Sequence, residues 1–113
     1  MNKSRARSVS GRPFLALSGK METACDTLRA MSHETRLKIL CLLDEGEMPV
    51  NRIADAVGQS VSTVSQHLSK LRSADLVTSR RDGQTILYAS SRGIGSAVIQ
   101  TLCGYYKLPA RDD

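Results

Sequence analysis

Long apolar runs are missing from this sequence of 113 residues. A membrane-spanning helix needs about 20 consecutive apolar residues, and no stretch of the chain approaches that length. Residues 11–17 are too few, and their flank is too basic, to predict a signal peptide. We therefore expect a cytoplasmic protein. A chain this short forms one domain with a marginal core, so burial against a second copy is expected to add stability.

Motifs of catalysis are missing as well. The sequence has no Gly-x-Ser-x-Gly turn, no phosphate-binding loop and no histidine–cysteine pair of catalytic type. Its most obvious polar cluster lies on the exposed face of a predicted helix, where no pocket would exclude water. These absences argue against an enzyme and leave a nucleic-acid-binding protein or a protein-interaction module. Strong, salt-dependent affinity for DNA would distinguish the first class from the second.

The net charge of +5 comes from one end of the chain. Removing the first five basic residues leaves 11 basic residues to balance 11 acids. The residues that carry the excess are Lys3, Arg5, Arg7, Arg12 and Lys20. We expect residues 1–17 to form a basic, flexible arm. The arm either follows a DNA backbone or serves as a solubilising tail, and the sequence leaves both open.

Residues 60–72 are the most informative stretch. The apolar positions there follow an i, i+3, i+7, i+10 pattern, which is one narrow stripe of an α-helix. They are Val61, Val64, Leu68 and Leu71. The other positions are small, polar or basic, and none is acidic. The alternative, an ordinary serine-rich surface helix, is weakened by the helices and the hairpin that flank this stretch.

The polar face of this helix suits the major groove of DNA. Hydroxyl and amide groups can read base edges, while Lys70 and Arg72 meet phosphates. We expect Ser62, Thr63 and Gln66 to face bases, and the remaining members of the set to serve phosphates or the minor groove. The predicted DNA-binding residues are Ser60, Ser62, Thr63, Ser65, Gln66, His67, Lys70, Arg80, Arg81 and Gln84.

Four further helices are predicted, near residues 17–31, 33–43, 50–57 and 91–106. Ser32 is expected to cap the second helix, which is apolar on most sides and therefore central. The third helix ends at Gly58 and forms a helix, tight turn, helix unit with the helix that follows.

A hairpin is predicted at residues 78–88. Asp82-Gly83 separates two short runs there, which is a strong hairpin signal. The two arginines at its tip, Arg80 and Arg81, favour contact with flanking DNA, so the hairpin would act as a wing.

With this order of elements, the chain resembles the SmtB/ArsR family of winged helix-turn-helix repressors. The resemblance rests on AMSHETRLKIL at residues 30–40 and SVSTVSQHLSKLR at residues 60–72, and it covers about residues 21–106. It implies a mainly α fold of about five helices with a small β-hairpin wing, within a domain at residues 18–107 followed by a tail at 108–113. It also implies a homodimer joined through its first and last helices. Such a repressor binds a two-fold symmetric, double-stranded DNA operator and releases it when an inducer is sensed.

Ligands of the family's metal-sensing branches are absent. Those branches use a Cys-x-Cys beside an acid around the third helix, or paired Asp and His on the last helix. Residues 50–57 contain no cysteine, and residues 91–107 contain no histidine or carboxylate. The only histidines are His33 and His67. We therefore expect no zinc or other metal, and no cofactor.

The cysteines carry the candidate inducer chemistry. Cys41 matches the thiol of the family's dithiol branch, which responds to sulfide and oxidants and pairs it with a second cysteine near the end of the last helix. By alignment that second cysteine falls close to Lys107, whereas Cys103 lies four residues earlier, one helical turn away. Since a disulfide needs Cα atoms within about 7 Å, the shift could forbid a direct bond, although a bridge with extra sulfur atoms spans further. We expect Cys41 and Cys103 to sense a reactive sulfur species, such as a persulfide or polysulfide, or an oxidant.

Other interpretations of the cysteines stay open. Cysteine is among the most buried residues, so Cys41 and Cys25 would be inert core thiols on a packing interpretation. If Cys25 joined the other two, a site for trivalent arsenic or another soft metal would form. A family member that resembles this chain around the recognition helix and wing works without a thiol pair, which gives a third interpretation, a ligand-independent repressor.

Overall fold

Six helices and a small three-stranded sheet make up residues 12–107, the part of the chain that the computed structural model describes. The helices are α1 (Pro13–Leu17), α2 (Met21–Met31), α3 (Glu34–Glu45), α4 (Val50–Val57), α5 (Val61–Ser73) and α6 (Ile94–Tyr106). The strands are β1 (Met48–Pro49), β2 (Val77–Asp82) and β3 (Thr85–Ser90). The predicted mainly α class with a β-hairpin wing is confirmed.

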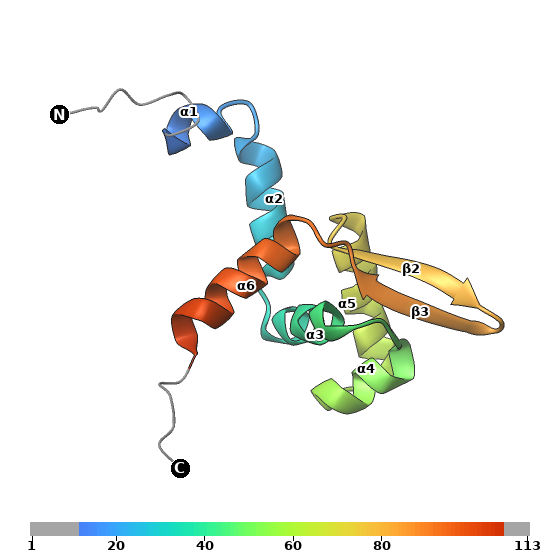
Figure 1. Ribbon diagram of the computed structural model, residues 1–113. Coiled ribbons are helices and arrows are strands. Elements are labelled where there is room, and N and C mark those ends of the chain that lie inside the picture. The colour runs from blue at the N-terminus through green and yellow to red at the C-terminus, as the bar shows by residue number, and fades with distance from the viewer. Residues whose placement is uncertain (1–11, 108–113) are drawn as a thin grey trace, which may run out of the picture.

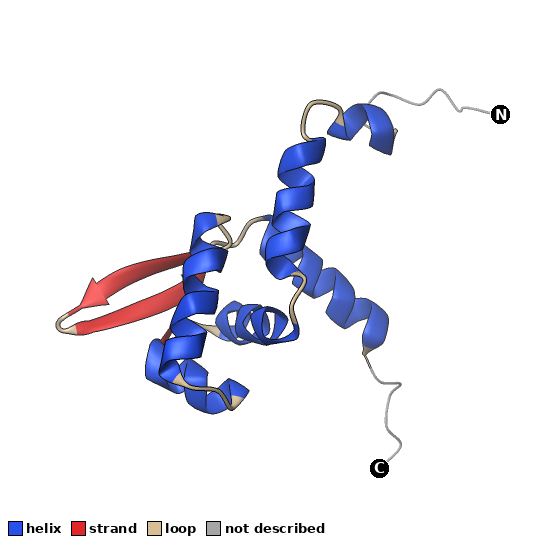
Figure 2. Cartoon of the chain, turned by 180° about the vertical axis from the view of Figure 1, so that it is seen from behind, coloured by secondary structure: helices blue, strands red, loops and turns tan. Residues whose placement is uncertain are grey.

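Helix α3 lies at the centre, as its apolar sequence predicts. It contacts α2, α4, α5, α6 and β3, and its Ile39, Leu40 and Leu43 are buried. Three buried residues of α5, Val64, Leu68 and Leu71, belong to the same core. Figure 1 shows α1 and α2 extending away from this body, while the β2–β3 hairpin projects from its other side. The view from behind in Figure 2 shows the same arrangement.

The helix-turn-helix unit forms as its turn residues predict, whereas the turn of the wing lies one residue later than the predicted Asp82-Gly83 turn. Gly58 ends α4 in the left-handed conformation, with φ of 73°, and Ser60 caps α5 two residues later. In the wing Asp82 pairs with Thr85, which leaves Gly83 and Gln84 as a two-residue turn. Strand β1 was not predicted, because two residues are too few to show a strand pattern. It pairs with β3 and makes the sheet three-stranded, in the order β1-β3-β2.

Several predicted boundaries shift. The first long helix begins at Met21 and not near Leu17, because Gly19 has a φ of 83°, which interrupts the helix. Helix α1 therefore lies inside the segment predicted as a flexible arm, with Pro13 in its first turn, where proline favours a helix. Residues 1–11 of the arm and the tail at 108–113 lie outside the described residues.

The N-terminal boundaries of α3 and α6 also differ from the predicted ones. The predicted Ser32 cap of α3 is wrong by one residue, since His33 Nδ1 accepts the capping hydrogen bond from the Thr35 N–H at 3.1 Å. Helix α6 begins at Ile94 and not at Ser91, because Arg92 adopts a φ of 62°, outside the helical region.

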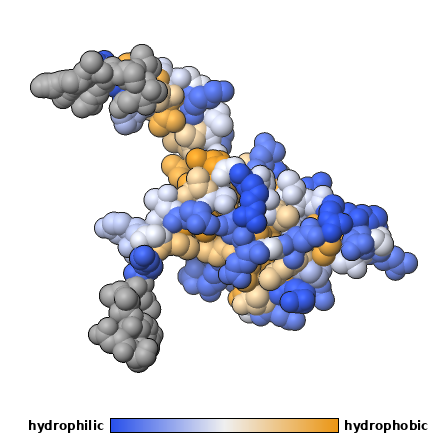
Figure 3. All heavy atoms as spheres, in the orientation of Figure 1, coloured by the Kyte–Doolittle hydropathy of each residue, from blue (hydrophilic) through white to orange (hydrophobic). Residues whose placement is uncertain are grey.

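Apolar side chains remain exposed on α1, α2 and α6. Figure 3 shows apolar residues at the surface along α1 and α2. Large exposed side chains on the three helices are Phe14, Leu15, Leu17, Met21, Leu28, Ile94, Leu102, Tyr105 and Tyr106. Their exposure leaves these helices with a surface that a second protein copy could cover. Within residues 12–107, no helix is long and apolar enough to cross a membrane.

Candidate nucleic-acid interface and thiol site

Helix α5 presents a polar face to solvent. Its predicted base-facing residues, Ser62, Thr63 and Gln66, are exposed, as are Ser65 and Lys70. The stripe beneath them is buried except at its first position, since Val61 is 46% exposed. This exposed residue departs from the predicted apolar stripe, because the first turn of α5 extends beyond the core. The face is therefore held rigidly by Val64, Leu68 and Leu71 and stays open to a partner.

The start of α5 is held by a local capping network. Ser60 Oγ accepts a hydrogen bond from the Thr63 N–H at 3.0 Å and donates one to Thr63 Oγ1, also at 3.0 Å. The cap satisfies one of the free N–H groups of the first turn. It also restricts the rotation of the Thr63 hydroxyl, so this side chain is preordered at the front of the polar face.

His67 lies at a helix junction more than on the open face. His67 is half-buried, and its Nδ1 accepts a hydrogen bond from Arg36 Nε at 3.1 Å. Arg36 Nη1 also donates to the carbonyl oxygen of Ala30 at 3.2 Å, so α2, α3 and α5 meet here. The His33 ring lies 4.5 Å away between centroids. Burial, followed by the charges of His33, Arg36 and Lys70, lowers the pKa of His67, so the neutral ring is favoured and only Nε2 is left for a phosphate.

The two wing arginines have different surroundings. Arg80 donates to Glu47 through Nη2 at 2.6 Å and through Nε at 3.1 Å, a bidentate pair. The pair lowers the pKa of Glu47 and raises that of Arg80, first through the hydrogen bonds. Arg81 and Gln84 are exposed nearer the turn. Sequence reasoning missed Glu47, because it lies 33 positions before its partner, and only the three-stranded sheet, in the order β1-β3-β2, brings the two segments together.

Cys41 of α3 and Cys103 of α6 converge. Both line one open apolar hollow of about 550 Å³, together with side chains that include Leu37, Ile99 and Tyr106. The pKa of the Cys41 thiol is raised, first by burial of its sulfur and then by the neighbouring Cys103. Cys103 therefore lines the same hollow as Cys41, although it lies one helical turn before the predicted register.

The cysteines are free and exposed, including Cys25 on α2. In a single chain Cys41 and Cys25 are therefore not part of the buried core, although enough protein surrounds the Cys41 sulfur for burial to be the main cause of its raised pKa. Across residues 12–107, no three His, Cys, Asp or Glu side chains gather at metal-binding distance. A three-thiol site within one chain is excluded by this geometry, since all three cysteines lie in that range.

A polar cluster beside the thiols joins α3 to α6. Asp44 accepts hydrogen bonds from Ser96 Oγ and Gln100 Nε2, both at 2.6 Å, and from Arg92 Nη1 at 3.3 Å. The Ser96 hydrogen bond is the main reason that the pKa of Asp44 is lowered, although burial opposes it. Sequence reasoning missed this cluster. The available signal was the i, i+4 spacing of Ser96 and Gln100, which places both on one helix face.

Comparison with known proteins agrees with the fold. Residues 33–79 match a family model described as a bacterial regulatory protein of the arsR family. The chain is 46% identical over 85 residues to the nodulation protein NolR of Rhizobium meliloti, covering 75% of this chain and 70% of that protein. Reduced HlyU from Vibrio cholerae superposes with a TM-score of 0.76 at 34% identity, covering 82% of this chain and 98% of HlyU. The homodimeric winged helix-turn-helix DNA-binding domain of Mb0332 from Mycobacterium bovis gives a TM-score of 0.72 at 26% identity, with coverages of 88% and 87%.

Proposed function

Since this chain belongs to the arsR family of bacterial regulatory proteins, we propose that it is a repressor released from its operator when Cys41 and Cys103 become linked. The family places it among DNA-binding transcription regulators and not among enzymes. The observation that carries the proposal is the shared hollow, in which the two thiols interact across α3 and α6.

The repressor acts as a homodimer joined through its first and last helices. Support comes from the exposed apolar side chains of these helices, such as Leu28 on α2 and Tyr105 on α6, which are 57% and 79% exposed in one chain. Large exposed apolar side chains gathered on a few helices are typical of an interface between protein chains. The homodimeric state of the Mb0332 domain points the same way.

Each α5 enters the major groove of one half-site of a two-fold symmetric operator. The two recognition helices then lie about 34–36 Å apart, which is one turn of the duplex. Ser62, Thr63 and Gln66 read base edges, while Lys70 and Arg81 meet phosphates or the minor groove. The predicted members Ser60, Ser65, His67, Arg80 and Gln84 keep supporting roles at the backbone.

Cys103 reacts first, because burial raises the pKa of Cys41 and so lowers the fraction of that thiol present as the reactive thiolate. The Cys103 thiolate attacks a sulfur atom of a polysulfide and becomes a persulfide, while a shorter polysulfide leaves with the electron pair of the broken S–S bond. Cys41 then loses its proton to solvent and attacks the sulfur bonded to the Cys103 carbon. A Cys41–Cys103 disulfide forms, and hydrosulfide leaves with the second electron pair.

The link releases DNA by changing the spacing of the two reading helices. Cys41 belongs to α3, which contacts α5, and Cys103 belongs to α6, which lies in the proposed dimer seam. A small rotation of α6 against α3 therefore moves both copies of α5 away from the duplex repeat at once. The link weakens binding only by as much as it favours the wrong spacing.

Operator affinity tests the proposal. A binding site is first selected in vitro with the reduced protein, and its affinity is measured before and after polysulfide treatment for the wild type, Cys41→Ser and Cys103→Ser. We expect release only in the wild type. The matched control is Cys25→Ser, which should respond as the wild type does.

Three results would contradict this mechanism. Release in either single variant rules out the thiol pair. A wild type that never releases DNA favours the ligand-independent repressor. Release by arsenite that requires Cys25 indicates a soft-metal site formed between two chains.

A further inference from the structure

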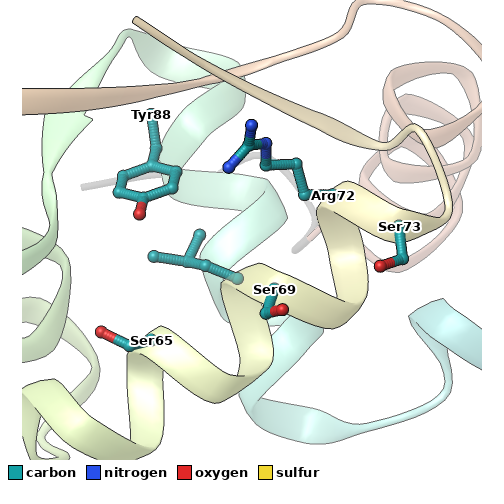
Figure 4. A pocket seen from close by; sticks show the side chains of 6 residues that line it. Ser65, Ser69, Arg72, Ser73 and Tyr88 are labelled. Atoms are coloured by element: carbon teal, nitrogen blue, oxygen red, sulfur yellow. The ribbon is translucent and has the colours of Figure 1, made fainter. Parts of the chain in front are cut away.

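A polar hollow of about 270 Å³ lies between α5 and strand β3 of the wing. It is lined by Ser65, Leu68, Ser69, Arg72, Ser73 and Tyr88. Five of the six lining residues come from α5, and Tyr88 comes from β3, where it pairs with Met48 of β1. Figure 4 shows the Tyr88 hydroxyl facing the α5 side of the hollow and Arg72 reaching back over its helix toward Tyr88.

The lining consists almost entirely of groups that can donate hydrogen bonds. Three serine hydroxyls, one phenol and one guanidinium surround the hollow, and no acid lines it. Among residues 12–107, Arg72 forms no ion pair, in contrast to Arg80, Arg92 and Arg29. A guanidinium without a carboxylate partner, beside several hydroxyls, can donate hydrogen bonds to a phosphate, whose oxygens only accept them.

The position of the hollow decides which phosphate it takes. In the proposed complex α5 occupies the major groove and the wing reaches toward the adjacent minor groove. The sugar–phosphate strand that separates these two grooves must then cross the gap between α5 and β3. We propose that this hollow seats one backbone phosphate of the operator in each half-site, held by Arg72 and Tyr88 with Ser69 or Ser73.

This inference rests on the proposed DNA-binding function and adds a site to it. Residues at the front of α5 read bases, whereas the seat lies toward the C-terminal half of that helix and touches the wing. A phosphate bound to both elements fixes the angle between them. The seat therefore sets the register of the protein on the duplex and carries no sequence preference of its own.

The test uses the full chain and the DNA site selected by the wild type. Arg72→Gln should weaken specific and random DNA alike and should lower the salt slope by about 1 for each subunit. Tyr88→Phe removes one neutral hydrogen bond, so affinity should fall by about 2- to 10-fold with an unchanged slope. Single methylphosphonate substitutions along the operator then locate the contact. At one position in each half-site, neutralising the phosphate should lower the affinity of the wild type for the operator. The same substitution should not lower the affinity of Arg72→Gln any further.

Arg29→Gln on α2 is the matched control, since it removes one positive charge outside the hollow. Thermal unfolding of Arg72→Gln and Tyr88→Phe verifies that both variants fold. Suppose that the wild type binds a selected site, but every methylphosphonate substitution that weakens its binding also weakens the binding of Arg72→Gln. The proposed phosphate site is then wrong, while the repressor function stands. If the wild type selects no site at all, the proposed function itself fails. Binding of inorganic phosphate by DNA-free protein that is lost in Arg72→Gln would assign the hollow to a free anion and overturn the inference.

Discussion

Asp44 and Gln100 join α3 to α6 one helical turn from each of the two thiols. The Gln100 amide donates to Asp44 Oδ2 at 2.6 Å, and Ser96 occupies the other carboxylate oxygen at the same distance. Asp44 follows Cys41 by three residues, and Gln100 precedes Cys103 by three. The Asp44 side chain is only 8% exposed, whereas its partners Gln100 and Arg92 lie at exposed positions. These hydrogen bonds hold the two helices in the register in which both thiols face one hollow.

Replacing Asp44 should therefore lower the stability of the fold and also slow the reaction between the two thiols. In Asp44→Asn the charge is lost and only one oxygen remains to accept from Ser96, Gln100 and Arg92. Loss of hydrogen bonds to a charged group costs about 1.5–3 kcal/mol, which should appear as a lower free energy of unfolding in urea. Linking of Cys41 to Cys103 by polysulfide should also slow. Asp55→Asn, at an exposed position of α4, is the control, and an equal loss there would remove any special role for Asp44.

The pH dependence of stability should reveal His67. Its pKa lies below the ordinary value of 6.5, so above that value the ring is neutral in both the folded and the unfolded chain. As the pH falls below 6.5, the unfolded chain takes up the proton first, and stability is lost until the pH passes the lowered pKa of the folded state. Urea unfolding at pH 7.5 and 5.5 should show this loss in the wild type and a smaller one in His67→Gln, which keeps an acceptor for Arg36. Identical losses in both proteins would contradict the assignment.

Gln66 should determine base preference at one position of each half-site. It is exposed in the middle of the polar face of α5, where an amide can bond to two atoms of one base. Gln66→Ala should relax discrimination at that position by about 1–3 kcal/mol and leave other positions unchanged. Competition binding with a panel of single-base operator variants measures this directly. Unchanged preference would exclude Gln66 from base reading.

The two wing arginines should respond differently to substitution. Arg81→Ala should weaken all DNA sequences alike and lower the salt slope by about 1 for each subunit. Arg80 is paired with Glu47, so part of its charge is neutralised in the protein without DNA. Glu47→Gln should therefore tighten binding to any sequence and steepen the slope. Salt titrations of fluorescent operator binding test both variants, and an unchanged Glu47→Gln slope would mean that Arg80 does not approach DNA.

Mass spectrometry should find the first sulfur adduct on Cys103. In Cys41→Ser a persulfide should accumulate on Cys103, because no second thiol is present to displace it. In Cys103→Ser the contribution of Cys103 is lost, but burial still raises the pKa of Cys41, so modification of the remaining thiol should be slower at neutral pH. Faster reaction at Cys41 than at Cys103 would reverse the proposed order.

Much of the fold follows from the sequence, because its strongest signals are local. The i, i+3, i+7 stripe of α5, the left-handed Gly58 and the hairpin turn at Gly83 each depend on residues within a few positions of one another. Local geometry of this kind is set by backbone sterics and by the periodicity of burial, and both can be read from a single sequence. The helix-turn-helix unit and the wing were predictable for that reason, and so was the polar face of α5.

The remaining features depend on contacts between distant segments. Glu47 meets Arg80, Asp44 meets Gln100, and Arg36 meets His67 across 33, 56 and 31 positions. Periodicity cannot assign such partners, because it gives the face of a helix and not the neighbour that the face will meet. The same limit applies to Cys103, whose alignment to the family register left its reach to Cys41 open. The sequence alone determined which elements form and which side of each is polar, whereas the crossing of α6 over α3 decided that the two thiols share a hollow. That crossing is set by the packing of whole helices, which no local pattern encodes.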